Sequence, residues 1–402
     1  MKFKPVCKYE RLSQNVLGGQ TVTDWISTDS VDAFWDQFLE LTSLGQFQQS
    51  AFWARVKAAD GWAPIRILST VGDDIISGFQ ILQRSHWLGR IGYVSKGPVV
   101  IPGFPGTAEY TLELLLRLTR REGIRALVIQ PPDRCEQIPP LLVDRGLPPD
   151  VLAEVNGATW IIDLSEGADA VERRMCSQTR RKIKLAIKRN IKIREGERDD
   201  LGVFFELMLA TCRRQGVQPI PAKLENMLAL WDAAGPARRI RITLAECEGE
   251  PLAGLICILF GETINFWKKG WASSEGQRNP NELLMHEGLR WASVNGFKTA
   301  DFCAFDSQIA STILKGGALT PEQEGSRHTF HMRLGGAPRI LPRTSIYVPN
   351  PLCRVAYNVA FQRQIRCARK EYRSEEGLAN PAEDVQEIAA PTNIVGELHN
   401  TN

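Results

Sequence analysis

The feature that most constrains the fold is an order of elements that the chain uses twice. The second copy contains two strand-like runs that form a hairpin, a third run, a helix and a closing strand, at Ile240–Cys247, Pro251–Phe260, Thr263–Trp271, Asn281–Asn295 and Lys298–Phe305. Turn residues join the first two runs, and Gly296 follows the helix where a C-cap glycine is expected.

The same order appears earlier, at Ala63–Thr70, Ile75–Gln83, Ile91–Val100, Thr111–Arg121 and Ala126–Gln130. Gly254 follows Gly78 by 176 residues, and Gly296 follows Gly123 by 173 residues. A nearly constant spacing over separate landmarks indicates a duplicated unit.

Hairpin, strand, helix, glycine and strand is the core order of the GNAT acyltransferases, and the chain resembles them in this respect. The resemblance implies an α/β (α+β layers) protein with two tandem GNAT-like acyltransferase units, each able to hold an acyl donor where central strands separate. Over 402 residues we expect a lead-in, two units, a basic amphipathic helix and a disordered acidic tail, at 1–30, 31–158, 159–348, 349–373 and 374–402.

Helical periodicity predicts further helices before each sheet. In the first unit these are Val31–Leu41, capped by Ser30, and a helix capped by Ser50. In the second unit they are Glu166–Lys188, Leu201–Gln215 and Ala222–Ala234. Glu166–Lys188 is strongly basic outside its apolar stripe.

Composition places the chain among cytoplasmic proteins. Its nine cysteines include no CxxC pair, which is typical of a reducing compartment, and we expect no metal site. The first residues lack the apolar core of a signal peptide, and no run approaches the ~18 apolar residues of a membrane span.

Several enzyme signatures are absent from the sequence, namely GxGxxG, a Walker loop, HExxH and GxSxG. The glycine-rich loop that holds coenzyme A pyrophosphate in GNAT proteins is also missing. Its place, before the helix at Asn281, reads GQRNP, with one glycine and a proline that removes an amide. We therefore expect no cofactor.

Five stretches carry a more specific resemblance: FQQSAFWARVK (47–57), YVSKGPVV (93–100), TRRKIKLAIKRNIKI (179–193), NPNELLMHEGLRWASVNGFKTADF (279–302) and FHMRLGG (330–336). In this order they resemble motifs of the FemA/FemB/FemX family, the aminoacyltransferases that build peptidoglycan side-chain bridges. The resemblance implies a role in cell-wall biogenesis. An aminoacyl group would move from aminoacyl-tRNA to an amine of a UDP- or lipid-linked muramyl peptide.

An ester donor is already activated, so the enzyme mainly orients an amine against a carbonyl and stabilises the oxyanion. By position in the family motifs, the substrate-binding candidates are Lys57 for a diphosphate, Tyr93 and Lys96 in the precursor loop, Arg180 for phosphate or tRNA, and Trp267 beside the peptide. The alternative for each is a structural role: a solvated lysine, strand-end residues, a solvated helix face or a core aromatic.

The sequence also departs from the family pattern. No acidic residue follows Gly97-Pro98-Val99, and the long coiled-coil arm of some members is absent. His331 replaces a lysine of the closing motif. The catalytic candidates are therefore His331, as a donor or base near neutral pH, and Arg333, which would supply the missing charge.

Three questions stay open. The helix at 351–373 either rests peripherally on an anionic membrane or packs on the second unit with its charges in water. The first alternative function is an N-acyltransferase that uses an acyl-CoA or acyl-carrier donor on exopolysaccharide or cell-envelope amino sugars. The second is a non-catalytic RNA-binding protein.

Overall fold

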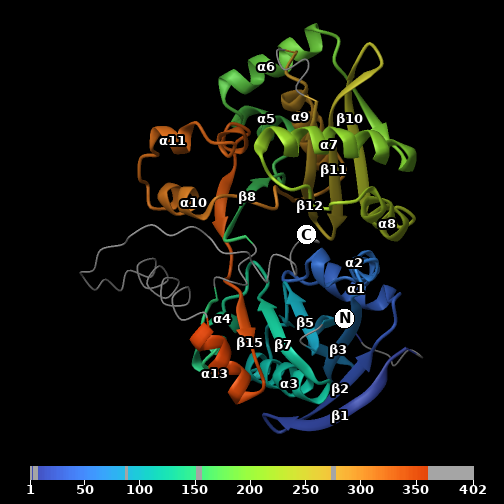
Figure 1. Ribbon diagram of the computed structural model, residues 1–402, viewed down its shortest axis with the longest axis vertical. Coiled ribbons are helices and arrows are strands. Elements are labelled where there is room, and N and C mark those ends of the chain that lie inside the picture. The colour runs from blue at the N-terminus through green and yellow to red at the C-terminus, as the bar shows by residue number, and fades with distance from the viewer. Residues whose placement is uncertain (1, 3–7, 87–88, 151–155, 273–277, 361–402) are drawn as a thin grey trace. The chain divides into compact units, whose positions relative to one another are not determined.

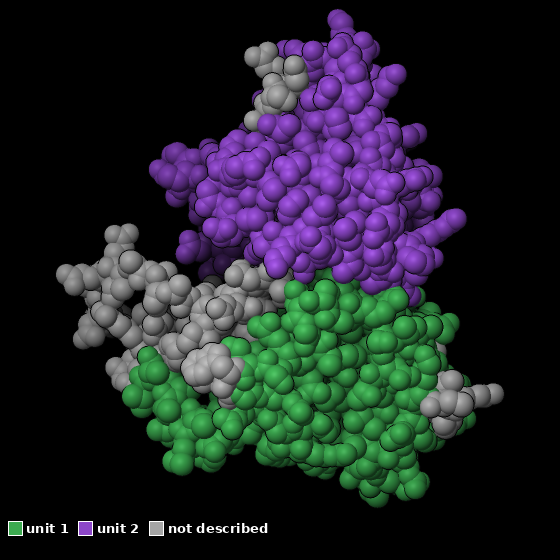
Figure 2. All heavy atoms as spheres, turned by 45° about the vertical axis from the view of Figure 1, so that its right-hand side comes forward, with its two compact units in different colours: residues 1–155, 342–401 green, residues 156–341, 402 purple. Residues whose placement is uncertain are grey.

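A computed structural model describes residues 2, 8–86, 89–150, 156–272 and 278–360 (Figure 1). The chain forms two compact units (Figure 2). Among the described residues, unit 1 comprises those within 2–150 and 342–360, and unit 2 comprises those within 156–341. Residues 342–348, expected in the second unit, therefore belong to unit 1.

Unit 1 is built on an eight-stranded sheet in the order β1-β2-β3-β4-β5-β7-β15, with β6 paired to β4. The strands are β1 (Glu10–Leu17), β2 (Gln20–Ser27), β3 (Ala63–Val71), β4 (Asp74–His86), β5 (Gly89–Ser95), β6 (Val99–Val100), β7 (Ile124–Gln130) and β15 (Ser345–Tyr347). β5 and β7 are parallel, and all other pairs are antiparallel.

The expected lead-in contains β1 and β2, which extend this sheet as a hairpin. Buried polar residues concealed the strand pattern in the sequence. Asp24 is fully buried in β2, where it accepts hydrogen bonds from the hydroxyls of Ser69 and Tyr110, both at 2.7 Å. A buried carboxylate needs such partners, and they come from elements far along the chain.

The helices of unit 1 are α1 (Ala33–Glu40), α2 (Ala51–Ala58), α3 (Thr107–Arg121), α4 (Ile138–Asp144) and α13 (Pro351–Ala360). Asp32, not Ser30, caps α1 by accepting the Trp35 amide at 2.9 Å. Ser50 caps α2 as predicted. The expected amphipathic helix is described only as α13, since its continuation and the acidic tail lie outside the described residues.

Unit 2 has a seven-stranded sheet in the order β14-β8-β13-β12-β11-β10-β9. The strands are β8 (Ala158–Asp163), β9 (Lys192–Gly196), β10 (Ile240–Cys247), β11 (Glu250–Phe260), β12 (Thr263–Trp271), β13 (Thr299–Asp301) and β14 (Ala337–Ile340). The predicted limits of β10 and β12 are confirmed, and β11 begins one residue earlier than predicted. The closing strand β13 is shorter than expected.

The helices of unit 2 are α5 (Ala168–Arg174), α6 (Ser177–Lys188), α7 (Leu201–Gln215), α8 (Leu224–Ala234), α9 (Pro280–Val294), α10 (Ser307–Leu314), α11 (Pro321–Glu324) and α12 (Thr329–Met332). α7 packs on β11 and β12 from one face, and α9 lies on the opposite face with α5 and α6 against it (Figure 1).

The single helix predicted at 166–188 is broken between α5 and α6. Met175 has an extended backbone, with ψ of 145°, and its side chain is buried in the core. The Arg180 guanidinium donates to the carbonyls of Met175 and Arg173, which the break leaves without helical partners.

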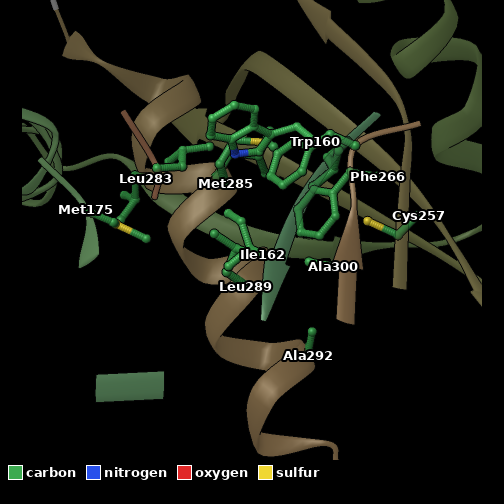
Figure 3. Close-up of a cluster of buried hydrophobic side chains, with 14 of the residues drawn as sticks. Trp160, Ile162, Met175, Cys257, Phe266, Leu283, Met285, Leu289, Ala292 and Ala300 are labelled. Carbon is green, nitrogen blue, oxygen red and sulfur yellow. The ribbon is translucent and has the colours of Figure 1, made fainter. Parts of the chain in front are cut away.

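The core of unit 2 lies between the sheet and α9 (Figure 3). Leu283, Leu289 and Ala292 of α9 pack with Ile162 of β8 and Phe266 of β12.

The duplicated order is present in both units. Hairpins β3–β4 and β10–β11 lead to β5 and β12, then to α3 and α9, then to the parallel strands β7 and β13. Gly123 and Gly296 have φ of 66° and 84° just after these helices, a conformation that glycine adopts without strain. Over the described residues, none of the helices combines the length and apolar character needed to cross a membrane.

Candidate functional site

The strands β12 and β13 separate in unit 2. They pair from Thr263–Thr299 to Asn265–Asp301, and β12 then continues to Trp271 beside β11 without β13. In unit 1 the matching strands stay paired up to Ser95–Gln130. Of the two corresponding strand pairs, β5–β7 in unit 1 and β12–β13 in unit 2, only the second separates. The edge of β12 beyond Asn265 therefore does not pair with β13.

A β-bulge at Trp267 changes the faces of β12. Lys268 pairs with Ile256 and Phe266 pairs with Cys257, so Trp267 is the extra residue of β12 at this register shift. Because of this extra residue, the side chains of Phe266 and Lys269 both lie on the face of the sheet that α9 covers. Lys268 and Gly270 lie on the opposite face, which α7 covers. Trp267 is half-buried, and the Lys268 ammonium lies 5.1 Å from its ring centre.

Lys269 was not singled out in the sequence. Its ammonium lies 4.0 Å from the ring centre of Phe330, which comes from α12. Burial lowers the pKa of Lys269 to about 8, with Arg214 acting in the same direction and Glu282 opposing them. A lysine at this pKa exchanges its proton in the physiological range.

His331 follows Phe330 and is also enclosed. Its ring packs against Phe302, with 4.9 Å between centres, and its Nδ1 has no hydrogen-bond partner among the described residues. Burial lowers the pKa of His331 to about 3, and the charge of Lys269 contributes. His331 is therefore neutral at pH 7 and does not replace the charge of the family's lysine. The role of His331 as a donor or base near neutral pH stays a prediction from the sequence, and this low pKa does not favour it.

Arg333 lies on the wall of a pocket of about 270 Å³. The pocket is lined by Thr179, Lys182, Glu282, Glu324, Gly325, Ser326, Arg327, Thr329, Phe330 and Arg333. The Arg333 side chain is exposed and forms no ion pair among the described residues, while its carbonyl accepts the Cys176 amide at 3.0 Å. Its guanidinium is therefore available to an anionic ligand.

An ion pair crosses this pocket. Lys182 of α6 donates to Glu282 of α9 at 2.8 Å. The charges of Lys182 and Glu282 cancel. The remaining charged residues of the lining are Glu324, Arg327 and Arg333, so the pocket carries a net positive charge. Such a charge fits an anionic group, for example a phosphate.

Arg180 does not line this pocket. It is half-buried, and its guanidinium bonds to the two carbonyls at the α5–α6 break. Beside it, Cys176 caps α6. Partial burial opposes ionisation of Cys176, but hydrogen bonds from Thr179 and Gln178 and the nearby Arg333 lower the pKa of its thiol overall.

In unit 1, the candidates Lys57 and Tyr93 come from the helix α2 and the strand β5. Lys57 is 5% exposed on α2, with its ammonium 5.1 Å from the Trp53 ring centre. Ala54, one turn away, packs with Leu82, and Tyr93 contacts the same cluster. The Tyr93 hydroxyl donates to Gln130 at 2.9 Å, and burial raises its pKa to about 12.

Lys96 is held by an ion pair. It has φ of 54°, is 6% exposed and bonds to Asp133, whose other oxygen accepts from Gln46 at 2.6 Å. Its charge is therefore neutralised inside unit 1. Local sequence patterns could not predict this pair, because Asp133 lies after β7 and therefore far from Lys96 in the sequence.

Gln49 positions the same loop and was missed in the sequence. Its side-chain amide donates to the carbonyls of Ser95 at 2.6 Å and Gln80 at 3.2 Å, and its oxygen accepts the Gln80 amide at 2.7 Å. The FQQS motif thus joins the start of α2 to the middle of β4 and the end of β5.

The comparisons with known proteins agree with this fold. Residues 173–308 match the family model described as "Acetyltransferase (GNAT) domain". A lipid II:glycine glycyltransferase of Staphylococcus saprophyticus is 23% identical over 231 residues, covering 54% of this chain and 55% of that protein. The chain therefore spans about half the length of this curated relative.

The crystal structure of FemX matches 80% of this chain and 97% of its own, with a TM-score of 0.68 and 17% identity. A tandem GNAT protein from the clavulanic acid biosynthesis pathway matches 80% and 97% at a TM-score of 0.48 and 11% identity, which is too weak to support an argument. The predicted α/β fold with two tandem GNAT-like units is confirmed. Residues 173–308 are thus similar to a GNAT acetyltransferase domain, and the fold of the chain is similar to that of FemX.

Proposed function

We propose that the chain is an aminoacyltransferase that moves an aminoacyl group from aminoacyl-tRNA to an amine of a UDP- or lipid-linked muramyl peptide. The observation that carries this proposal is the bulged part of β12 that continues beyond its last pair with β13, near a cationic pocket in unit 2. Backbone groups freed from a strand pair can align an acyl group, and the arginines can hold a phosphate near it.

The exposed surface of α6 supports an RNA donor. Arg181, Lys184, Lys188 and Arg189 are exposed, and none forms an ion pair among the described residues. Cations free of carboxylate partners bind a phosphate backbone with a strong dependence on salt. Arg327 and Arg333 extend this charge to the pocket.

For the acceptor, we propose Lys57 and Tyr93 of unit 1 as contacts. Support comes from the packing of Tyr93 on a cluster that includes Ala54, which lies on the same helix as Lys57, and from the lysine's compact charge, which suits a diphosphate. Lys96 would act indirectly, since its ion pair with Asp133 holds the loop. In unit 2, Trp267 would contact the peptide from the bulge, and Arg180 would act through the α5–α6 break.

We also propose that α13 contacts an anionic membrane, where a lipid-linked acceptor is found. One side of α13 packs against the rest of unit 1. There, Arg354 donates to the Gly146 carbonyl at 2.5 Å and Tyr357 donates to Asp150 at 2.8 Å. Leu352, Val355 and Val359 share the opposite side and are 80%, 60% and 62% exposed. The arginines at 363, 366 and 369 follow in sequence.

A mass assay tests the transfer. The full chain would be mixed with a charged tRNA pool and either UDP-MurNAc-pentapeptide or its lipid-linked form, with uncharged tRNA as the control. An acceptor heavier by one aminoacyl residue is the expected product. A product formed only from acetyl-CoA would place the chain with the acyl-CoA alternative, and absence of product from every donor would contradict the proposal.

Vesicle flotation tests the membrane contact separately. The chain should float with vesicles containing phosphatidylglycerol and less with neutral vesicles. Substituting Leu352 and Val359 by Asp should abolish flotation, whereas the same change at exposed Val16 of β1 should not. Equal flotation of both variants would exclude α13 as the contact.

A further inference from the structure

Lys269 is a cation of β12 that contacts Phe330, a residue of the unit 2 pocket wall. It lies on the part of β12 beyond the last pair with β13, and the bulge at Trp267 directs it to the α9 face. Its ammonium lies over Phe330, which also lines the cationic pocket. The closing motif has His331 where a lysine stands in the family pattern, and this strand supplies a lysine beside it.

We propose that Lys269 accepts the proton released by the attacking amine during acyl transfer, an assignment that rests on the proposed function. The amine nitrogen bonds to the ester carbonyl carbon, and the bond from that carbon to the ribose oxygen breaks. The neutral Lys269 amine takes one proton from the nitrogen. The resulting ammonium returns it to the departing ribose oxygen, so that an amide and a free hydroxyl result.

The surroundings of Lys269 fit a group that changes protonation during turnover. Glu282 of α9 favours the ammonium, but its carboxylate is already paired with Lys182. Arg214 of α7 disfavours the ammonium, and the neighbouring His331 of α12 is neutral above pH 3. Burial against an aromatic ring adds to this, giving a pKa of about 8. A base is most effective when its pKa is near the working pH.

The other titratable groups at the pocket suit this task less well. His331 is too weak a base with a pKa of about 3, and the guanidinium group of an arginine such as Arg333 offers only hydrogen-bond donors. Glu282 is held in its ion pair. Lys269 is therefore the group whose basicity matches the proton of an attacking amine.

Lys269→Arg tests the role, because it keeps the charge and the contact with Phe330 but removes the base. The matched control is Lys268→Arg, on the neighbouring residue that faces α7. We expect Lys269→Arg to lower kcat by about 10²-fold or more and the control by less than about threefold. Wild-type kcat should rise with pH to an inflection near 8, and that inflection should be absent from Lys269→Arg.

A second measurement does not depend on turnover. Competitive acetylation with acetic anhydride at a series of pH values, read by mass spectrometry, gives the pKa of Lys269 in the free chain. A value near 8 together with loss of kcat in Lys269→Arg supports the proposal. A value near the ordinary 10.5, or a variant with unchanged kcat and pH profile, overturns it. Failure of the proposed function is seen differently, as a wild-type chain that forms no amide.

Discussion

Lys182 and Glu282 are a hundred positions apart in the sequence, yet their side chains form a 2.8 Å ion pair on the wall of the unit 2 pocket. The pair joins α6 to the first turn of α9, beside the place where GNAT proteins bind coenzyme A and where this chain has Asn279-Pro280. It also sets the charge felt by Lys269. Glu282 therefore links the ion pair of the pocket wall to the pKa of Lys269.

Glu282→Gln should lower the pKa of Lys269 further, because the carboxylate that favours its ammonium is removed. The inflection in kcat should move to lower pH. Stability should fall by no more than about 1 kcal/mol, since Lys182 remains partly solvated. Competitive acetylation and urea unfolding measure the two effects. A rise in the Lys269 pKa would contradict this account.

Arg333→Ala should weaken donor binding about tenfold while leaving the melting temperature nearly unchanged. The side chain is exposed and forms no ion pair among the described residues, so folding does not depend on it. Arg290→Ala is the control, since that exposed arginine of α9 is paired with Glu287 and lies outside the pocket lining. Titration with aminoacyl-tRNA distinguishes them, and equal affinities would remove Arg333 from the site.

Replacing exposed cations of α6 should reduce RNA affinity and its salt dependence. For Arg181, Lys184 and Lys188 changed together to Ala, the slope of log K against log salt should fall by about 2–3, because each phosphate contact contributes about 0.7–0.9. Arg117, Arg121 and Arg125 of unit 1, changed in the same way, provide a control of equal charge. Filter binding over a salt series gives both slopes. Identical slopes would place the RNA elsewhere.

His331 should make stability sensitive to acid. Its pKa is about 3 when folded and ordinarily about 6.5, so between these values the unfolded chain binds the extra proton. Stability due to this group is fully present above pH 6.5 and is lost as pH falls toward 3, by up to about 1.4 kcal/mol per pH unit. His331→Phe should lose less stability than the wild type between pH 7 and pH 5 in urea unfolding. Parallel losses would show that His331 is not buried in its neutral form.

Gln49→Ala should destabilise unit 1 by about 2–4 kcal/mol, because it leaves buried groups of Gln80 and Ser95 without partners. Gln48→Ala is the matched control, since the Gln48 side-chain oxygen has no hydrogen-bond partner among the described residues. The difference in urea midpoint between the two variants measures how much the hydrogen bonds of Gln49 stabilise unit 1. Equal midpoints would mean that these hydrogen bonds of Gln49 do not stabilise unit 1.

Local patterns predicted the fold where hydrophobic period and turn residues agree. The limits of β10, β12 and α7 follow from apolar runs bounded by glycine, charged turns or a capping segment. β2 was missed because Asp24 interrupts its alternation, and its partners Ser69 and Tyr110 are distant in sequence. The break before α6 was missed because it depends on a core position for Met175 and on Arg180 reaching back to free carbonyls.

The sequence by itself determined the order of elements, their duplication, the absence of a glycine-rich coenzyme A loop and the basic character of α6, because each is a property of residues close together in the chain. The tertiary structure decided which charges remain available. Asp133 neutralises Lys96, and burial removes the charge of His331 and makes Lys269 a stronger candidate for proton transfer. These outcomes depend on burial and on partners from other elements, and a change in either alters the free energy of the charged form.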